Sequence, residues 1–404
     1  MRQLLLLTTS FPFGRGEDFL TQELPYAQGF DQYIVCACHA PREAVQTKPV
    51  PEKMQVLRLQ AEESAVPYPA LLGKGDLWAE LFRLPCQGKA APGPAHELVF
   101  FRKKAEAVYR ALCRQALPLL KGDEIVLYSY WLYDAALAAA LLARRLRRMG
   151  KRVRLVSRAH GFDAFPERAR YGYLPMRRFL LSACDAVRPC SEQAAQAVRA
   201  ACPAMGGKVS PAYLGTADYG CPGGRRRPEF HLVTCSYLVP VKRISLLVQA
   251  LGQVGFPLRW THIGDGPQLE EVRAGAEKLP AHIHWELPGA MDNRALMEYY
   301  SREPVSCLVN VSSSEGLPVS LMEAASFGFP ALATAVGGTP EALREGQTGF
   351  LLPASPSPGQ IAGGLERLYR MEEEEYQAMC RNARRLWEER FSAARNFPRF
   401  YQEL

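Results

Sequence analysis

The chain has 404 residues, 48% of them hydrophobic and 22% charged, with a formal net charge of +8. This composition is that of an ordinary globular chain, and the length predicts two domains of roughly 200 residues each. No apolar run approaches the roughly 20 residues of a membrane span. We interpret the opening MRQLLLLTTSFPFG as a strand, because it lacks the small-residue cleavage site of a signal peptide.

The cysteine and charge patterns argue against a disulfide-rich, a zinc-binding and a nucleic-acid-binding protein. The 11 cysteines are scattered and show no second pair at metal spacing, which favours buried free thiols in a reducing compartment. The positive charge gathers in residues 144–154 and in Arg225, Arg226 and Arg227. A solvated helix end or an anionic membrane surface would account for it. Because no nucleic-acid module signature is present, we expect no nucleic-acid partner.

The chain begins with a strand, a glycine loop and a helix. We expect a strand at 3–9, a helix at 19–28, and between them a loop in which Gly14 and Gly16 allow close approach by a ligand. This topology cradles phosphates, but the third glycine of a dinucleotide fingerprint is missing. A dinucleotide oxidoreductase is therefore disfavoured.

Residues 60–120 are less regular. An amphipathic helix is expected at 68–84 and another over 98–120, which begins LVFFRKK. We interpret both as packing on the sheet. The alternative is a surface that docks on a bilayer, because basic–aromatic segments partition to that interface.

The next strands lead to a histidine. Strands are expected at 125–130, 153–159, 186–191 and 209–213, with a helix at 135–149. The strand at 153–159 runs into SRAHGFD, so His160 follows its carboxyl end. A lone histidine is more often structural, but α/β sheets place ligands at this edge. We therefore interpret His160 as functional.

The linker GCPGGRRRP, residues 220–228, divides the chain. We predict an amino-terminal domain at 1–222, a second at 223–384 and a helical segment at 385–404. The second series opens with LVTCSYLVPVKRISLLVQAL, which reads as strand, loop and helix, with Lys242 in the loop. Strands are also expected at 258–264 and 282–287.

The most informative stretch is NVSSSEGLPVSLMEAASFGFP, residues 310–330. A buried strand at 305–311 is followed by Glu315, then by a helix at 319–327 with Pro318 at its first position. The unpaired amides of residues 316–320 would face an anionic group, aided by the helix dipole. Glu323 comes eight residues after Glu315, a little over two helical turns, so both carboxylates can face one ligand.

This Glu-x7-Glu pair, framed by SSEGLP and EAxxxGxP, closely resembles the donor-site motif of the group 1 (family 4) retaining nucleotide-sugar glycosyltransferases. The resemblance implies the GT-B fold, an α/β architecture of two Rossmann-like domains facing a central cleft, with the C-terminal helix crossing back to the first domain. It also implies site residues. Those on the donor side are Lys242 for the diphosphate, Glu315, Gly316, Leu317, Pro318 and Val319 for the sugar, Glu323 for the ribose, Gly264 and Gly266 after a strand, and Pro288 at the nucleobase. Those on the acceptor and phosphate side are His160, Asp163, Gly14 and Gly16.

One position departs from the family pattern. The usual arginine five residues before the lysine is Tyr237, and Arg243 stands where glycine is commoner. We expect Arg243 to supply the missing charge to the diphosphate.

The activity implied by the resemblance is transfer of a hexosyl unit from a nucleotide sugar, with retention, to a glycan, glycolipid or other acceptor in cell-surface polysaccharide biosynthesis. Glu315 would position the sugar and His160 its hydroxyls or the acceptor. Because there is no Asp-x-Asp motif, we expect no metal and no cofactor. Relatives commonly use lipid-linked acceptors, which predicts a cytoplasmic enzyme attached peripherally to the inner face of the membrane. The alternative is a nucleotide-sugar 2-epimerase-like isomerase of the same fold; a non-catalytic binding module is disfavoured because both glutamates and the lysine are present.

Overall fold

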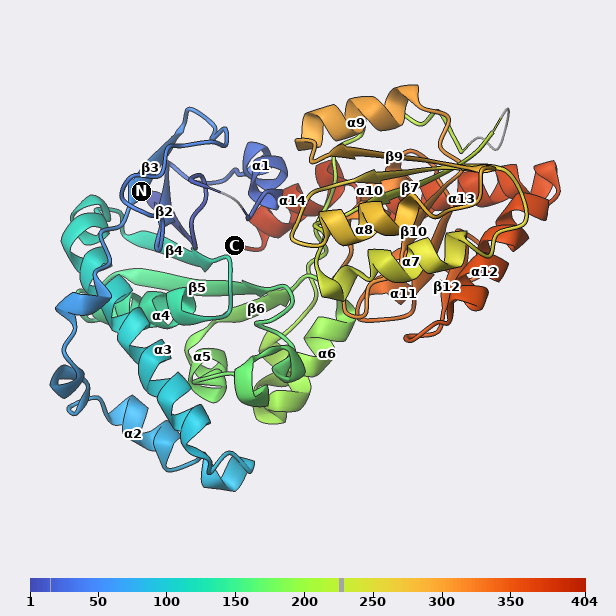
Figure 1. Ribbon diagram of the computed structural model, residues 1–404. Helices are drawn as coiled ribbons and strands as arrows, with labels where there is room; N and C mark the ends of the chain where they lie inside the picture. Colours follow the sequence, from blue (N-terminus) through green and yellow to red (C-terminus); the bar gives the residue numbers. More distant parts are fainter. Residues whose placement is uncertain (15, 225–228) are drawn as a thin grey trace. The chain divides into compact units, whose positions relative to one another are not determined.

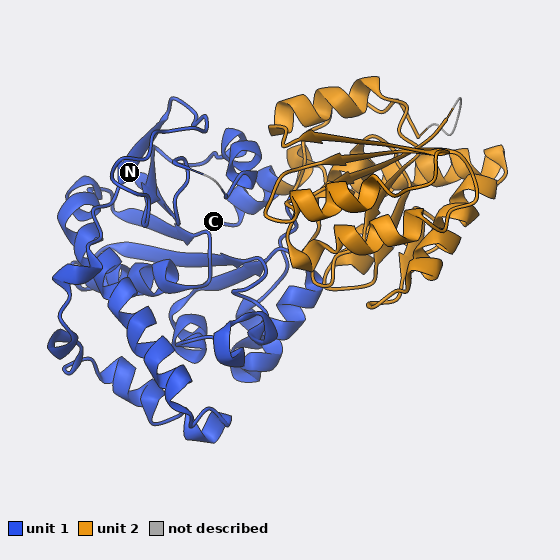
Figure 2. Cartoon of the chain, viewed as in Figure 1, with its two compact units in different colours: residues 1–214, 397–404 blue, residues 215–396 orange. Residues whose placement is uncertain are grey.

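The computed structural model describes residues 1–14, 16–224 and 229–404 (Figure 1). The basic run Arg225–Arg227 lies outside the described residues. The chain forms two compact units, Met1–Leu214 with Phe397–Leu404, and Gly215–Asn396 (Figure 2). The first boundary falls at 214/215, before the 222/223 expected from the linker. The reason is that Thr216 pairs with the chain near α14, donating to Phe391 O at 2.9 Å and accepting from Ala393 N at 3.0 Å.

Unit 1 contains a six-stranded parallel sheet in the order β3-β2-β1-β4-β5-β6. Its first strand, RQLLLLT, is apolar without alternation because helices cover both faces of a parallel sheet. The strands are β1 (Arg2–Thr8), β2 (Gln32–Ala37), β3 (Met54–Arg58), β4 (Glu124–Ser129), β5 (Arg152–Ala159) and β6 (Ala186–Pro189). The segment expected as a strand at 209–213 is not a regular strand. Val209 makes an isolated bridge to Val187, and the amides of Ser210 and Ala212 donate to Val187 O and Pro189 O of β6.

The helices of unit 1 differ from expectation in three places. The helix expected over 98–120 begins earlier, at Pro92, and its α-helical part ends at Ala111. The first helix of the chain ends at Tyr26 rather than at residue 28 and becomes 3-10 at Leu24, with Pro25 inside it. The helix expected at 68–84 is two pieces, η3 and α2. The helical segments are α1 (Phe19–Glu23), η1 (Leu24–Tyr26), η2 (Glu63–Ala65), η3 (Tyr68–Leu71), α2 (Gly75–Leu81), η4 (Pro85–Gln87), α3 (Pro92–Ala111), the π-helical η5 (Leu112–Ala116), η6 (Leu117–Leu119), α4 (Asp134–Arg148), η7 (Pro166–Arg168), η8 (Arg170–Gly172), α5 (Arg177–Ala183), α6 (Glu192–Ala201) and η9 (Pro203–Lys208).

The end of the chain returns to unit 1, as the fold class predicts. α14 (Ala393–Gln402) begins in unit 2 and ends in unit 1. Tyr401 and Tyr128 both donate to Glu23 Oε1, at 3.3 and 2.9 Å, and Arg158 Nε donates to Tyr128 Oη at 2.8 Å. Arg158 and Glu23 are fully buried, so this polar network fastens α14 to the strands that carry the site of unit 1.

Unit 2 repeats the topology with the order β12-β11-β10-β7-β8-β9, all parallel. Its strands are β7 (Phe230–Cys235), β8 (Leu258–Ile263), β9 (Ile283–Gly289), β10 (Cys307–Asn310), β11 (Ala331–Thr334) and β12 (Gly349–Leu352). Its helices are η10 (Pro240–Lys242), α7 (Ile244–Leu251), α8 (Leu269–Ala276), α9 (Asn293–Arg302), α10 (Val319–Ser326), α11 (Thr339–Ala342), α12 (Pro358–Arg370), α13 (Glu373–Arg390) and the start of α14.

Both sheets reverse their strand order once. The reversal lies between β1 and β4 in unit 1 and between β7 and β10 in unit 2. In open α/β sheets, ligands bind outside the carboxyl ends of the strands at this switch point. The loops after these four strands are therefore where a site is expected. No helix in the described part of the chain is both long and apolar enough to cross a membrane.

Candidate active site

In unit 2, two predicted donor residues meet at the switch point. Lys242 ends η10, after β7, and Glu315 follows β10. Lys242 Nζ lies 2.7 Å from Glu315 Oε1, and Asn310 Nδ2 donates to the same oxygen at 3.3 Å. Glu315 is only 8% exposed. A charged donor, Lys242, and a neutral donor, Asn310, hold its carboxylate in place.

Arg243 braces the two loops that carry this pair. Its Nε donates to Val311 O at 2.6 Å, and its Nη2 donates to Ser312 O at 2.9 Å and to Ala354 O at 3.0 Å. The backbone adds to this, because Ser313 N donates to Val241 O at 2.8 Å. Arg243 was expected to direct its charge at a diphosphate; in the structure its donors bind backbone carbonyls instead.

The amino end of α10 offers free amides. Within the described chain, the amides of Gly316, Leu317, Val319 and Ser320 donate no hydrogen bond. Pro318 is the N-cap of α10 rather than its first helical residue and contributes no amide. Gly316 O accepts from Gly338 N at 2.8 Å, which orients this turn. Such a cluster of amides at a helix amino end binds anionic oxygen.

The other end of α10 explains why the helix is short. Gly328 has φ +72°, and its amide donates to Ala325 O at 3.0 Å while Phe329 N donates to Ala324 O at 2.9 Å. These two bonds form a Schellman motif, which stops the helix. Glu323 therefore sits in the last turns of an eight-residue helix.

Glu323 is a buried carboxyl rather than a solvated one. It is 6% exposed, and Asn293 Nδ2 donates to its Oε1 at 2.8 Å. Burial raises the pKa of Glu323 to about 7, against the hydrogen bond from Asn293, which lowers it. At neutral pH the group is thus divided between its acid and its carboxylate. Asn293 was not predicted, since nothing in the sequence pairs it with a residue thirty positions away.

Gly264 and Gly266 serve loop packing. A Cβ on Gly264 would lie 1.9 Å from Ser236 O, and one on Gly266 would lie 2.5 Å from Leu238 O. The loops after β7 and β8 can approach only because both positions are glycine. Pro288 lies exposed near the end of the edge strand β9.

In unit 1, a carboxylate that the sequence reading missed organises the switch point. Glu17 is 8% exposed, and its carboxylate accepts from the indole Nε1 of Trp131 at 2.8 Å. It also accepts from the amides of Thr9, Ser10 and Phe11, at 2.7, 2.8 and 2.8 Å. The loop turns at Gly14 and Gly16, with φ of +71° and +93°. The only sequence signal was an acidic residue directly after this glycine loop.

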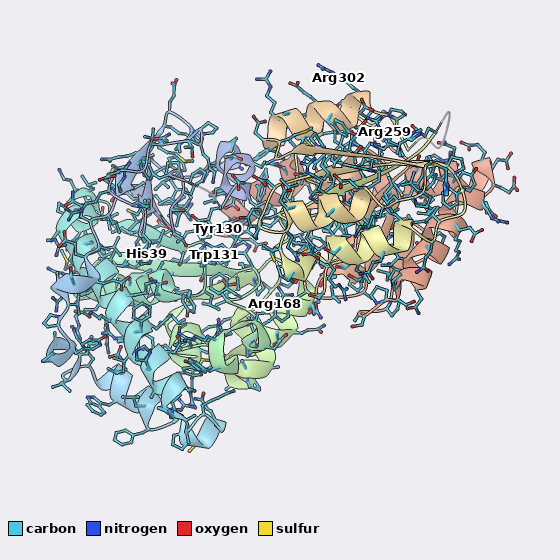
Figure 3. The ribbon with its side chains drawn as sticks, in the orientation of Figure 1. His39, Tyr130, Trp131, Arg168, Arg259 and Arg302 are labelled. Carbon is cyan, nitrogen blue, oxygen red and sulfur yellow. The ribbon has the colours of Figure 1, made fainter. Side chains whose placement is uncertain are left out.

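His160 follows β5 and contacts the two aromatic residues after β4, Tyr130 and Trp131, which Figure 3 labels. Its ring centroid lies 4.4 Å from that of Tyr130 and 4.8 Å from that of Trp131. His160 Nε2 lies 3.0 Å from Tyr130 O, and since a carbonyl only accepts, Nε2 carries the hydrogen. Burial and the nearby Arg158 charge lower the pKa of His160 to about 3. The ring is therefore neutral at pH 7, with Nδ1 as an acceptor.

Asp163 holds the loop rather than facing a ligand. Its Oδ1 accepts from the amides of His160 and Gly161, at 2.8 and 3.0 Å, and its Oδ2 accepts from Leu132 N at 3.0 Å. The residue is fully buried. In the structure Asp163 therefore supports the turn that carries His160.

The two doubly wound units have the GT-B fold, and a lysine–glutamate pair and free helix amides lie at the switch point of the second. Residues 224–386 match the model of the family Glycosyl transferases group 1. The match lies within unit 2 and does not extend into unit 1. The predicted fold class is confirmed by the two parallel six-stranded sheets and by the solved structures that share this fold.

Similar proteins include the putative colanic acid biosynthesis glycosyltransferase WcaL of two bacteria. That of Salmonella typhimurium is 23% identical over 262 residues, which are 61% of this chain and 63% of the relative. That of Escherichia coli is 24% identical over 297 residues, which are 70% and 71%. The first alignment thus spans just under two thirds of the relative's length.

Solved structures share the fold along the whole chain. Anabaena Alr3699/HepE in complex with UDP has a TM-score of 0.65 at 16% identity, covering 100% of this chain and 99% of that one. The apo lipopolysaccharide outer core galactosyltransferase WaaB has a TM-score of 0.69 at 14% identity, covering 100% of both chains.

Proposed function

We propose that this chain transfers a hexosyl unit from a nucleoside-diphosphate sugar to a glycan, glycolipid or other acceptor in cell-surface polysaccharide biosynthesis. The observation that carries the proposal is the Lys242–Glu315 pair beside the free amides of α10. A lysine and amides suit a diphosphate and a developing negative charge, and a fixed carboxylate suits sugar hydroxyls. Alr3699/HepE, which has this fold, was solved with UDP and with UDP-glucose, which supports a nucleotide sugar as the donor.

In this proposal each donor residue has one task. Lys242 and the amides of Gly316, Leu317 and Val319 balance the charge of the leaving diphosphate. Glu315 positions the sugar, and Glu323 accepts from the ribose hydroxyls. No metal is required, because these cationic and amide groups take the place of a divalent ion.

The transfer proceeds with retention at the anomeric carbon, on one face of the sugar, with the leaving phosphate as base. His160 Nδ1 accepts a hydrogen bond from a hydroxyl group of the donor sugar or of the acceptor. Its neutral state suits this task, since an imidazolium would have no lone pair to offer.

The names of the relatives support a class of acceptor, and the location is part of the proposal. The WcaL proteins are named for colanic acid biosynthesis, which supports a polysaccharide or lipid-linked acceptor here. We place the enzyme in the cytoplasm, attached peripherally to the inner face of the membrane through unit 1.

A donor screen tests the proposal. Thermal shift with nucleoside diphosphates and nucleotide sugars should find a stabilising donor, because a ligand at 100 times its Kd adds about 2.7 kcal/mol to stability. Incubation of that donor with candidate acceptors, followed by NMR of the product, should give the anomeric configuration of the donor. Conversion of the donor sugar to its 2-epimer without any acceptor would favour the isomerase instead. No response to any nucleotide would overturn the proposal.

A further inference from the structure

Unit 1 contains a cavity of about 400 Å³ that shares no lining residue with the site described above. It is bordered by α2 and η4, by the segment before α5, and by the turn after α6. Four cationic side chains line it: Arg83, Lys89, Arg177 and Arg178. We refer to it as the cationic pocket.

The cations of this pocket outnumber the acids near them, which are Glu80 in the lining and Asp163, which interacts electrostatically with Arg177. In the described chain, none of the four forms an ion pair, and Lys89 Nζ donates to a carbonyl, Tyr171 O, at 3.1 Å. The acid among the lining residues is Glu80, whose Oε1 accepts from Tyr173 Oη at 3.1 Å. The pocket therefore has a positive surplus that an anion would balance.

Arg177 adds a second indication. It is 8% exposed, and its Nη2 donates to Asp163 O, while Nε and Nη1 are buried without an acceptor. Burial lowers the pKa of this guanidinium to about 10. Buried charged donors without partners are unfavourable, so a ligand oxygen that reached them would be stabilising.

Apolar side chains crowd the stretch that borders the pocket. Phe82 is 76% exposed and Leu72 is 63% exposed, and Tyr68 and Trp78 are exposed as well. The rings of Trp78 and Phe82 lie 6.3 Å apart. These four residues form the apolar patch, and Lys103 Nζ lies 4.5 Å from the Tyr68 ring centroid beside it. Aromatic residues mixed with cations are typical of segments that lie in the bilayer interface.

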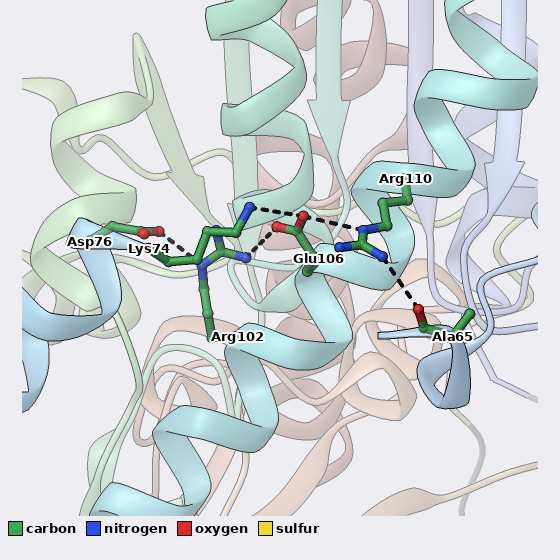
Figure 4. A network of polar contacts seen from close by, with 6 residues as sticks. All are labelled: Ala65, Lys74, Asp76, Arg102, Glu106 and Arg110. Carbon is green, nitrogen blue, oxygen red and sulfur yellow. Dashed lines mark hydrogen bonds and ion pairs between the residues drawn. The ribbon is translucent and has the colours of Figure 1, made fainter. Parts of the chain in front are cut away.

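A buried network holds the patch in place (Figure 4). Arg102 of α3 is 1% exposed and binds Asp76 Oδ2 through Nε and Glu106 Oε2 through Nη1, each at 2.9 Å. Lys74 Nζ donates to Glu106 Oε1 at 3.0 Å. Because this network fixes α2 on α3, the apolar patch is presented outward rather than folded into the core.

We propose that the cationic pocket binds a phosphate group, and that this phosphate belongs to an anionic lipid of the bilayer on which the apolar patch rests. Guanidinium groups match phosphate oxygens in pairs. A small soluble phosphate would leave the neighbouring exposed aromatic side chains without a role, whereas a bilayer accounts for both features. Binding of this lipid would give the proposed peripheral attachment a specific ligand. It would not depend on binding of the sugar donor in unit 2.

The experiment is flotation of the full chain with phosphatidylglycerol and with phosphatidylcholine vesicles. Arg83→Gln/Arg178→Gln should lower binding to anionic vesicles about 30-fold, since each basic residue near an anionic leaflet contributes roughly a factor of five. Phe82→Ser should lower it about tenfold, since a phenylalanine side chain gains at least that factor on burial. The matched controls are Arg302→Gln/Arg370→Gln in unit 2 (Figure 3 labels Arg302) and the 74% exposed Val45→Ser.

Three further measurements complete the test. The loss of thermal shift by inorganic phosphate and glycerol phosphate in Arg83→Gln/Arg178→Gln reports the pocket, because the anion-binding groups of unit 2 are unchanged in that variant. Unchanged nucleotide binding by each variant shows intact folding and an independent unit 2. Stabilisation by free phosphate without any vesicle binding would overturn the lipid as the source. Equal flotation of pocket variants, patch variants and controls would overturn the proposal. If no nucleotide binds, the proposed function is contradicted, but the proposed lipid site in the cationic pocket is not.

Discussion

Lys242 Nζ and Glu315 Oε1 lie 2.7 Å apart, so two groups expected to hold different parts of a donor form an ion pair with each other. Lys242→Ala should destabilise the protein by about 1–3 kcal/mol, because it leaves a buried carboxylate without its cation. Adding Glu315→Gln should restore much of that stability without restoring donor affinity. Urea denaturation and calorimetry of both variants measure the two effects. Independent, additive losses of stability would contradict the coupling.

Glu323→Ala should lower the affinity for the nucleoside diphosphate about 10- to 150-fold, as expected for loss of a charged hydrogen bond of roughly 1.5–3 kcal/mol. The fold should stay intact. Titration calorimetry with the diphosphate checks this, with a substitution of the exposed Glu298 of α9, Glu298→Ala, as the control. Unchanged affinity would show that Glu323 does not bind the ribose.

The raised pKa of Glu323, about 7, predicts a pH dependence. If the carboxylate form binds the ribose, affinity at pH 6 should be about tenfold lower than at pH 8. The folded state binds this proton more tightly than the unfolded chain, so the stability that the group contributes is present at low pH and is lost between pH 4.5 and about 7. Glu323→Gln should therefore be more stable than the natural protein at pH 8 and should abolish the affinity change. A pH-independent affinity would contradict a titrating Glu323.

Turnover should persist in excess chelator. Lys242 and the amides before α10 supply the positive potential that a divalent ion supplies elsewhere. An assay with the donor identified by thermal shift, with and without chelator, measures this. Loss of activity that magnesium or manganese restores would overturn the metal-free proposal.

His160→Ala should cut transfer strongly while nucleotide binding stays near normal, because Lys242, Glu315 and Glu323 all belong to unit 2. With a pKa lowered to about 3, His160 should give no inflection in the transfer rate between pH 6 and 8. Steady-state rates and binding constants, measured in parallel, separate the two effects. Equal losses in both would make His160 a purely structural residue.

Several features of the fold were predictable because they depend on local pattern. The unbroken apolar runs of β1 and β10 predict buried parallel strands, and the series of strands and helices predicts two doubly wound units. Gly328 and Pro330 predict the end of α10 from backbone geometry alone. The basic cluster at 144–154 was left open, and in the structure several of its members are paired, for example Arg147 with Asp185 at 2.8 Å.

The amino-acid sequence by itself determined the class of fold and the order of the motif residues along the chain, because these follow from periodicity and from spacing within one segment. Only the tertiary structure decided what each polar side chain contacts. Arg243 meets carbonyls from another loop, Asp163 is surrounded by amides, and Asn293 reaches Glu323 from a different helix. The physical reason is that hydrogen bonds and burial between distant segments arise only when the sheet brings loop ends together, and no local pattern encodes those partners.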